Sequence, residues 1–189
     1  MRFFLKLAGF AVLGILCGAG ATLVFRGAIA SYPAASGIAS ALPGPPQRLI
    51  IPSIGVDAPV LAVGVAKNGD LGVPPDATHV AWYKNGPEPG APGAAVIDGH
   101  LDTIHEPQAV FYNLGKLKPG DEVDVVASSG RTFAFRVTAV TAIAYDATTT
   151  AVFTSSGGAP ELNLITCTGD WMPSMHLYNE RLVVFTKLE

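Results

Sequence analysis

From Gln47 to its last residue, the chain alternates short apolar runs with clusters of glycine, proline, asparagine and aspartate. Aliphatic, aromatic and β-branched runs bounded by such clusters are typical of strands. A short helix or turn is expected within residues 107–117. The close spacing of the runs predicts a mainly β fold, an antiparallel or mixed barrel or sandwich. Eight strands are predicted, at residues 48–52, 58–65, 78–83, 94–100, 122–128, 132–143, 161–167 and 181–187.

A different pattern occupies the N-terminus, where nineteen residues from Leu7 to Phe25 carry no charge. At about 1.5 Å per residue, a helix of this length spans the hydrocarbon core of a bilayer. Basic residues precede the run, so the positive-inside rule places residues 1–6 in the cytoplasm as a short tail. We therefore expect a transmembrane anchor at residues 7–26, in a single-pass protein of the cell membrane whose remaining residues are extracytoplasmic.

A cleaved signal peptide is the alternative to an anchor, since "AIA" at residues 28–30 has the form of a cleavage site. The apolar part of a signal peptide is usually shorter than this run, which favours the uncleaved anchor. Residues 27–46 are rich in alanine, serine, glycine and proline without apolar periodicity, as expected for a linker. Residues 47–189 then form one domain, large enough to bury a core without disulfides.

The positions of the two cysteines affect how Cys167 is interpreted. Exported domains normally pair their cysteines in disulfides. Cys17 lies inside the expected anchor, so Cys167 has no partner within the exported domain and is a candidate reactive thiol. The net charge of −3 and the absence of basic clusters give no reason to expect nucleic acid binding.

Three chemically active side chains fall at the ends of predicted strands. Cys167 and His100 each end a strand, and Arg181 begins the last one. Two antiparallel strands joined by the segment between them would place Cys167 and Arg181 side by side. The alternation of side chains along a strand puts Asp98 on the same face as His100. These ends are therefore expected to converge on one rim of the barrel.

A thiol, an imidazole and a guanidinium together suit acyl transfer, as nucleophile, proton carrier and oxyanion ligand. With unperturbed pKa values of roughly 8.5 and 6.5, only about one thiol–imidazole pair in a hundred is thiolate–imidazolium near neutral pH. A neighbouring arginine is expected to raise that fraction. Taken singly, the same residues also fit a packed thiol, a turn histidine and a solvated arginine, so the residue pattern alone leaves both interpretations open.

Around these residues the sequence resembles the sortases, cysteine transpeptidases that attach proteins to Gram-positive cell envelopes. The stretch "LITCTG" resembles the Thr-Cys active-site segment of the family, "DGHLDT" its Gly-His segment and "NERLVVFTKL" its closing strand with the essential arginine. The opening "RLIIPSIGVDAPV" is similar to the first strand pair, and Arg181 follows Cys167 by fourteen residues, as in the family. The details most resemble the actinobacterial class F, with class E next.

The resemblance implies an eight-stranded sortase-type β-barrel over residues 47–189, with short helices or turns. It implies that Cys167 attacks the Thr-Gly carbonyl of a Leu-Pro-x-Thr-Gly-like sorting signal and forms a thioacyl enzyme. His100 would protonate the leaving amine and then deprotonate the incoming one, and Arg181 would bind the oxyanion. The implied partners are surface proteins with a C-terminal sorting signal and an amine acceptor, such as a peptidoglycan precursor or a pilin lysine. No cofactor or metal is implied.

Four further residues are candidates for supporting or substrate-binding roles. Thr166, in the Thr-Cys motif, is expected either to supply a hydrogen bond or to pack inward. Asp98 and Asp102 flank the histidine, and either is placed in sequence to orient it. Trp171 lies in the segment 168–180, which we expect to be a loop bordering the peptide groove, so its ring either lines the groove or packs on the barrel.

Three other functions remain open from the sequence. The L,D-transpeptidases are exported cysteine enzymes too, but their nucleophile lies in a Ser-His-Gly-Cys type stretch that differs from "LITCTGDW". A non-catalytic exported β-domain would bind a ligand or partner and would tolerate the loss of Cys167. A metal site is the third, because alternate positions on a strand share a face. Its ligands would be Asp98, His100, Asp102 and His105.

Overall fold

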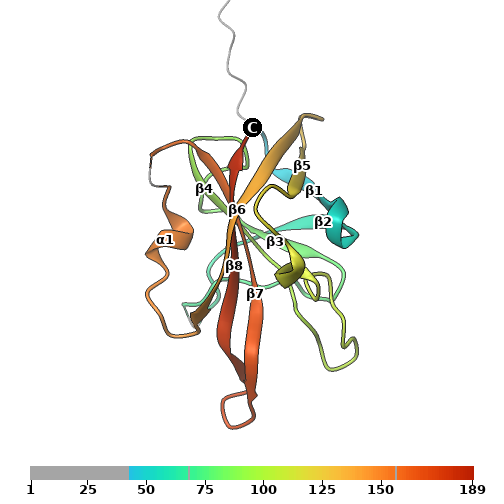
Figure 1. Cartoon of the computed structure of the whole chain (residues 1–189), viewed down its shortest axis with the longest axis vertical. Helices are drawn as coiled ribbons and strands as arrows, with labels where there is room; N and C mark the ends of the chain where they lie inside the picture. The colour runs from blue at the N-terminus through green and yellow to red at the C-terminus, as the bar shows by residue number, and fades with distance from the viewer. Residues whose placement is uncertain (1–42, 68, 156) are drawn as a thin grey trace, which may run out of the picture. The chain divides into compact units, whose positions relative to one another are not determined.

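The computed structural model describes residues 43–67, 69–155 and 157–189, and within them the chain is mainly β (Figure 1). The strands of this region are β1 (Pro46–Ile51), β2 (Val56–Val63), β3 (Val80–Tyr83), β4 (Gly93–Asp98), β5 (Glu122–Ala127), β6 (Thr132–Ala144), β7 (Pro160–Met172) and β8 (Leu177–Leu188). Its helices are the 3-10 turns η1 (Pro52–Ile54) and η2 (Leu114–Lys116) and the short α1 (Thr150–Phe153).

The expected membrane anchor is not among the described residues, whereas the expected short helix is. The anchor expected at residues 7–26 lies outside the described residues, as does the linker up to residue 42. None of the helices in the described region has the length and apolar character needed to cross a membrane. The helix or turn expected within residues 107–117 is present as η2, whereas α1 had no signal in the apolar pattern.

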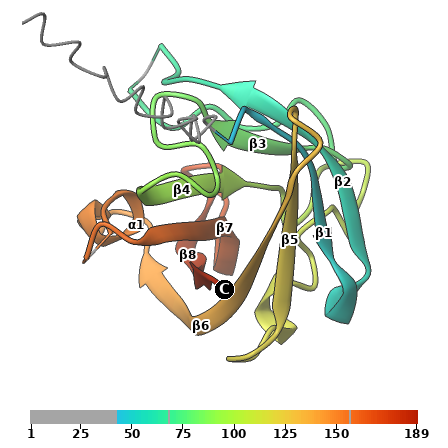
Figure 2. The same ribbon diagram turned by 90° about the horizontal axis from the view of Figure 1, so that it is seen from above.

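The eight strands of the described region close into one barrel in the order β1-β2-β3-β4-β7-β8-β6-β5 (Figure 2). β5 pairs back with β1, so the ladder of hydrogen bonds closes. The pairs β2–β3 and β4–β7 are parallel, and the other pairs are antiparallel. The mainly β barrel predicted from the sequence is confirmed, and each predicted strand is present, with the largest differences at the ends of β7 and β8.

Strand β7 separates two apolar clusters that hold its opposite faces. Leu162 and Leu164 point into the barrel and belong to its main core. Ile165 points outward and packs with Val96 and Val183 in a second cluster beneath α1. Each fully buried side chain of this kind stabilises the fold by about 1.5–3 kcal/mol. Burial on both faces fixes the register of β7, because a slip of one residue would exchange the two sets.

The segment from Thr168 to Glu180 was expected to be a loop, but most of it is strand. β7 continues to Met172 and β8 begins at Leu177, so the turn comprises residues 173–176. The resulting hairpin projects beyond the barrel (Figure 1). The border of the candidate site on this side is therefore a twisted pair of strands.

A β-bulge lies directly after Thr168 and explains why the sequence suggested a loop. The β7–β8 register shifts between Thr168 and Trp171, and Gly169 has a φ of 82°, in the left-handed region that favours glycine. Asn179 Oδ1 accepts a hydrogen bond from the Asp170 amide at 2.7 Å, which satisfies the bulged backbone. The pair Gly169-Asp170 is thus accommodated inside the strand.

The close approach of Gly99 to Phe111 gives a test of this packing. A Cβ atom on Gly99 would lie 2.5 Å from Cδ2 of the fully buried Phe111 ring. We predict that Gly99→Ala lowers the free energy of unfolding by about 1–3 kcal/mol, measured by urea denaturation, because the ring must shift. The matched control is Gly157→Ala, whose Cβ would meet nothing within 4 Å. Equal unfolding midpoints for Gly99→Ala and wild type would contradict the packing described.

Candidate active site

Cys167 and Arg181 lie opposite each other on adjacent strands. They are Cα partners in the antiparallel β7–β8 pair, as the strand pattern predicted. Cys167 is a free, half-buried thiol, and it shares the outward face of β7 with Ile165. The apolar cluster under α1 therefore leads along the strand to the thiol and the guanidinium.

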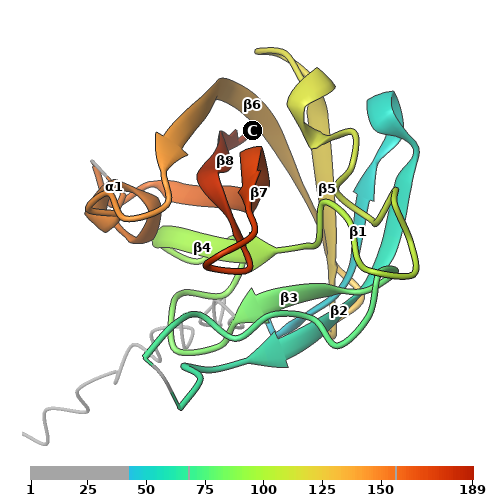
Figure 3. The same ribbon diagram turned by 90° about the horizontal axis from the view of Figure 1, so that it is seen from below.

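His100 reaches the same rim from the other side of β7. β4 and β7 are parallel with Asp98 level with Ile165, and the Gly99 amide donates to the Ile165 carbonyl at 3.1 Å. Continuing this register by two residues brings His100 level with Cys167. Seen from below, β4 lies beside β7 and β8 (Figure 3). The three residues singled out from the sequence thus come from three neighbouring strands of one rim.

Thr166 joins the histidine segment to the cysteine strand. Its side chain is 1% exposed, and its hydroxyl donates a hydrogen bond of 2.7 Å to the carbonyl of Gly99. The two roles considered for Thr166 are both present, since the residue packs inward and also supplies a hydrogen bond. The bond holds the backbone immediately before His100 against β7.

The imidazole of His100 is oriented by a backbone carbonyl. Its Nε2 lies 2.9 Å from the carbonyl oxygen of Pro74. A carbonyl only accepts hydrogen bonds, so Nε2 carries the proton and Nδ1 is left to exchange one. Within the described residues no hydrogen bond joins Asp98 or Asp102 to the ring. The residue that orients His100 is therefore one that no side-chain pattern indicated.

A compact turn follows Pro74 in the chain. Asp76 Oδ1 accepts hydrogen bonds from the amide of Thr78 at 2.9 Å and the amide of His79 at 3.0 Å. The His79 ring also lies against this carboxylate, with Nδ1 2.8 Å from Oδ2. These hydrogen bonds, the one with the His79 ring above all, hold the pKa of Asp76 well below its usual range. The ionised carboxylate thus stabilises the turn.

Asp98 lies on the same outward face as Cys167, at the end of β4. Burial raises the pKa of its carboxyl to about 7, although the Arg181 charge and the Gly99 amide both lower it. Its carboxyl therefore changes charge close to neutral pH, beside the thiol and the guanidinium. Asp98 is in the site, but as a charge near Cys167 and Arg181 and without a hydrogen bond to His100.

Burial also has the largest effect on the pKa of the Cys167 thiol. The pKa of Cys167 is raised chiefly because the sulfur is desolvated, and the charges of Asp98 and Asp102 raise it further. Arg181 lowers that pKa, as expected from the sequence, but its effect is the smaller one. The expected effect of the arginine is therefore present, and burial outweighs it. In the free protein the neutral thiol is favoured.

The guanidinium of Arg181 is held by its own strand. Nη1 donates to the carbonyls of Tyr178 at 3.1 Å and Glu180 at 3.0 Å. No residue of the described region accepts a hydrogen bond from Nε or Nη2. These N–H groups are free to bind an oxyanion or a peptide carbonyl, while Nη1 fixes the plane of the group.

The remaining two candidates lie on or beside the hairpin. Trp171 is 49% exposed and is a cross-strand partner of Tyr178, with ring centroids 5.3 Å apart in an edge-to-face arrangement. It therefore stands on the hairpin and is not packed into the barrel core. Asp102, on the loop after His100, accepts a hydrogen bond from the Tyr178 hydroxyl. This bond is the main reason that the pKa of Tyr178 is raised to about 12.

Sequence reasoning missed two residues of this site. Pro74 acts through its carbonyl, which every residue possesses, so no residue type could have indicated it. Tyr178 was inside a segment expected to be a loop, where strand alternation was not applied. Extending the register of Cys167 and Arg181 would have placed Tyr178 opposite Asp170, and the bulge in β7 moves it opposite Trp171. Among the described residues, no group of three or more His, Cys, Asp and Glu side chains is arranged to hold a metal ion.

The arrangement as a whole suits acyl transfer. The half-buried thiol of Cys167 lies opposite the guanidinium of Arg181, which has free N–H groups. The imidazole of His100, with one exchangeable nitrogen, follows the neighbouring strand β4. These groups can supply a nucleophile, an oxyanion ligand and a proton carrier at one rim.

Comparison with known proteins agrees with this geometry. A model of the sortase domain matches residues 49–189. The fold is similar to that of sortase C-1 from Actinomyces oris, at 25% identity and a TM-score of 0.58 over 75% of this chain and 70% of that one. It is also similar to sortase C2 of pilus island 1 from group B Streptococcus, at 24% identity and a TM-score of 0.57 over 75% and 72%. Sortase A from Corynebacterium diphtheriae, a lid mutant, gives 20% identity and a TM-score of 0.59 over 75% and 68%.

A search of curated protein sequences gave no significant match. The solved structures named above are sortases of classes C and A, so the assignment to class F or class E stays a prediction. The family model nevertheless covers far more than half of the chain. The chain belongs to the sortase family of cysteine transpeptidases.

Proposed function

We propose that this sortase cleaves a Leu-Pro-x-Thr-Gly-like signal between Thr and Gly and joins the acyl part to an amine of the cell envelope. One observation carries the assignment of roles. Cys167 is the Cα partner of Arg181 on β8, and on its other side β4 pairs with β7 as far as Asp98 and Ile165, two residues before His100 and Cys167. A nucleophile, an oxyanion ligand and a proton carrier thereby lie on or directly after three adjacent strands.

The first half-reaction forms the thioacyl enzyme. The Cys167 proton passes to Nδ1 of His100 as the sulfur attacks the threonine carbonyl carbon, and Arg181 binds the resulting oxyanion through Nε and Nη2. When the tetrahedral intermediate collapses, the carbon–nitrogen bond breaks and His100 returns the proton to the leaving glycine amine. Because burial favours the neutral thiol at rest, the reaction requires His100 to take the proton from Cys167.

The second half-reaction transfers the acyl group. His100, again neutral, takes a proton from the incoming amine as its nitrogen attacks the thioester carbonyl. Arg181 binds the second oxyanion, and the Cys167 sulfur leaves and regains a proton. The acceptor in this proposal is a peptidoglycan precursor amine or a pilin lysine, and the donors are surface proteins with a C-terminal sorting signal.

The proposed location completes the assignment. Residues 7–26 are long and apolar enough to act as a single transmembrane anchor, with the domain on the extracytoplasmic side. Surface proteins that carry sorting signals, and the amines of the envelope, are found on that side of the membrane. The unpaired Cys167 in an exported domain fits a catalytic thiol.

The roles of Cys167 and Arg181 are tested by turnover of an internally quenched Leu-Pro-Ala-Thr-Gly peptide with triglycine as the amine. The full chain in detergent micelles should release the fluorophore and form the triglycine product. We predict that Cys167→Ala reduces turnover to background, and that Arg181→Ala lowers kcat by about 10²–10³-fold because an oxyanion ligand is lost.

Arg181→Lys should recover only part of that loss, since an ammonium cannot reproduce the planar fork. Arg48→Ala is the matched control, because Arg48 is an exposed arginine paired with Asp57. Wild-type turnover by Arg181→Ala, with an unchanged melting temperature, would refute the assigned oxyanion role.

Asp98 gives a pH-dependent prediction for the thiol. Its carboxylate raises the pKa of Cys167, so Asp98→Asn should lower that pKa, but only at pH values where the wild-type carboxyl is ionised. With a carboxyl pKa of about 7, the variant should be alkylated by iodoacetamide at the wild-type rate below about pH 6. Above pH 8 it should react faster than the wild type, because the wild-type carboxylate then raises the pKa of the thiol and asparagine does not.

The control for this experiment is Asp146→Asn, an exposed carboxylate in the turn after β6. Its alkylation rate should equal that of the wild type at every pH. A rate ratio for Asp98→Asn that stays constant from pH 5 to pH 9 would show that Asp98 does not ionise near neutrality beside the thiol.

A further inference from the structure

Tyr178 has three contacts that meet at the candidate active site. Its hydroxyl donates to Asp102, on the loop that follows His100. Its ring packs edge-to-face on Trp171, and its backbone carbonyl accepts from Nη1 of Arg181. A residue absent from the predicted site therefore connects the histidine loop to the strand that carries the arginine.

The loop after His100 is fixed by hydrogen bonds at its start and is exposed to solvent further along. Its first residues are fixed by backbone hydrogen bonds, from the Phe111 amide to the His100 carbonyl at 3.0 Å and from the Ala109 amide to the Leu101 carbonyl at 3.1 Å. Further on the loop is solvated, with Ile104 98% exposed and residues 105–108 exposed as well. Asp102 lies where the fixed part meets the solvated part.

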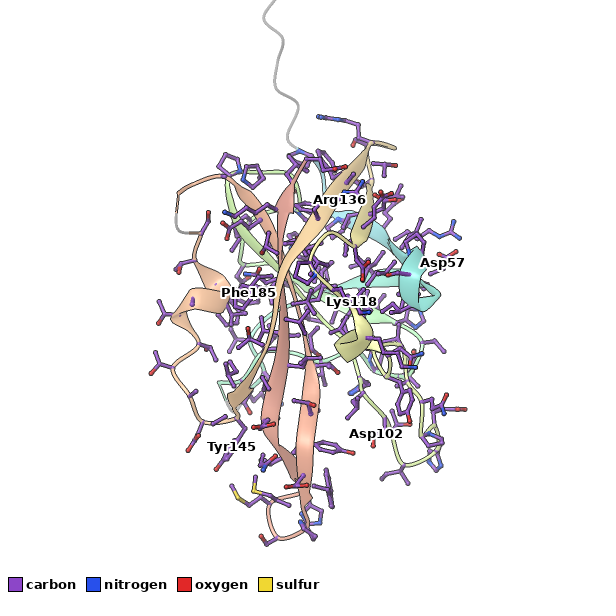
Figure 4. All side chains as sticks on the ribbon, viewed as in Figure 1. Asp57, Asp102, Lys118, Arg136, Tyr145 and Phe185 are labelled. Atoms are coloured by element: carbon purple, nitrogen blue, oxygen red, sulfur yellow. The ribbon has the colours of Figure 1, made fainter. Side chains whose placement is uncertain are left out.

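We propose that the hydrogen bond from Tyr178 to Asp102 is a latch that positions His100. It holds the loop that carries the imidazole against β8, and so sets the separation of the ring from Cys167 and Arg181. Tyr178 and Asp102 are positioning residues in this proposal, which rests on the proposed function for its kinetic consequences. Figure 4 shows Asp102 beside the β7–β8 hairpin, with Tyr145 on the other side of that hairpin.

The bond is not needed to satisfy buried polar groups. Both side chains are partly exposed, so each could bond to water if the other were removed. Loss of the bond should therefore change the unfolding midpoint little. Its effect should fall on the placement of a proton carrier, where an error of about 1 Å can lower the rate by about 10²-fold.

The charge of Asp102 argues for a positional role. That charge raises the pKa of Cys167, which disfavours the thiolate that attacks the substrate. A carboxylate retained for electrostatic activation of the thiol would have the opposite effect. Asp102 is explained better as an acceptor of the Tyr178 hydroxyl than as a charge acting on the sulfur.

Three substitutions distinguish the effect of the Tyr178–Asp102 hydrogen bond from the effect of the Asp102 charge. Tyr178→Phe keeps the ring on Trp171 and removes the donor, and Asp102→Ala removes the acceptor. Asp102→Asn removes the charge but keeps an amide oxygen that can accept the same bond. We predict that kcat falls about tenfold or more in Tyr178→Phe and Asp102→Ala with KM unchanged, whereas Asp102→Asn stays within about twofold of wild type. The double variant Tyr178→Phe/Asp102→Ala should be no slower than either single variant.

A second measurement follows the latch directly and does not depend on turnover. Amide hydrogen exchange at residues 102–106 should become faster in Tyr178→Phe and Asp102→Ala, but not in Asp102→Asn. Tyr145→Phe is the matched control, since the Tyr145 hydroxyl contacts Met175 at the hairpin turn and not the histidine loop. It should leave both the exchange rates and kcat at wild-type values.

The proposal is overturned if exchange at residues 102–106 is unchanged in Tyr178→Phe, or if exchange increases while kcat stays at the wild-type value. It is also overturned if Asp102→Asn loses as much activity as Asp102→Ala, because the charge would then be the cause. Wild-type protein without turnover would instead refute the proposed function, and the positioning of a proton carrier would fall with it.

Discussion

The site depends on the register of β7 between its two neighbours. β7 runs parallel to β4 with Asp98 level with Ile165, and antiparallel to β8 with Cys167 opposite Arg181. Leucines on the inner face and Ile165 on the outer face are buried in different clusters, so a slip of one residue would exchange the two sets. Core packing therefore determines which side chains meet at the rim. The hydroxyl of Thr166 adds a bond across the β4 side of this arrangement.

The electrostatics of the rim favour a neutral resting state. Burial keeps the Cys167 thiol protonated, and the carboxyl of Asp98, with a pKa of about 7, adds negative charge as the pH rises. Arg181 lowers the pKa of both groups, and backbone carbonyls anchor its Nη1, which leaves Nε and Nη2 for the oxyanion in the proposed mechanism. A neutral thiol is also less open to oxidation than a thiolate, which suits an unpaired cysteine at the proposed extracytoplasmic location.

The sequence predicts the features that follow from period and residue type. Apolar runs located all eight strands, and the strand ends correctly placed Cys167 beside Arg181. It could not reveal the carbonyl of Pro74, because backbone acceptors are common to all residues and depend on tertiary placement. The hairpin was missed because a glycine in a bulge and a glycine in a loop look alike until Asn179 is seen to satisfy the bulged amide. Tyr178 lies in this hairpin and was missed for the same reason.

The central claim is that Cys167 forms a thioacyl bond with a sorting signal, and intact-protein mass spectrometry tests it most directly. The full chain is mixed with a Leu-Pro-Ala-Thr-Gly peptide in the absence of an amine acceptor and quenched with acid. The account predicts a mass increase equal to the acyl fragment that ends in threonine, located on Cys167 by peptide mapping and removed by hydroxylamine. Peptide cleavage without such an adduct, or an adduct on a residue other than Cys167, would contradict it.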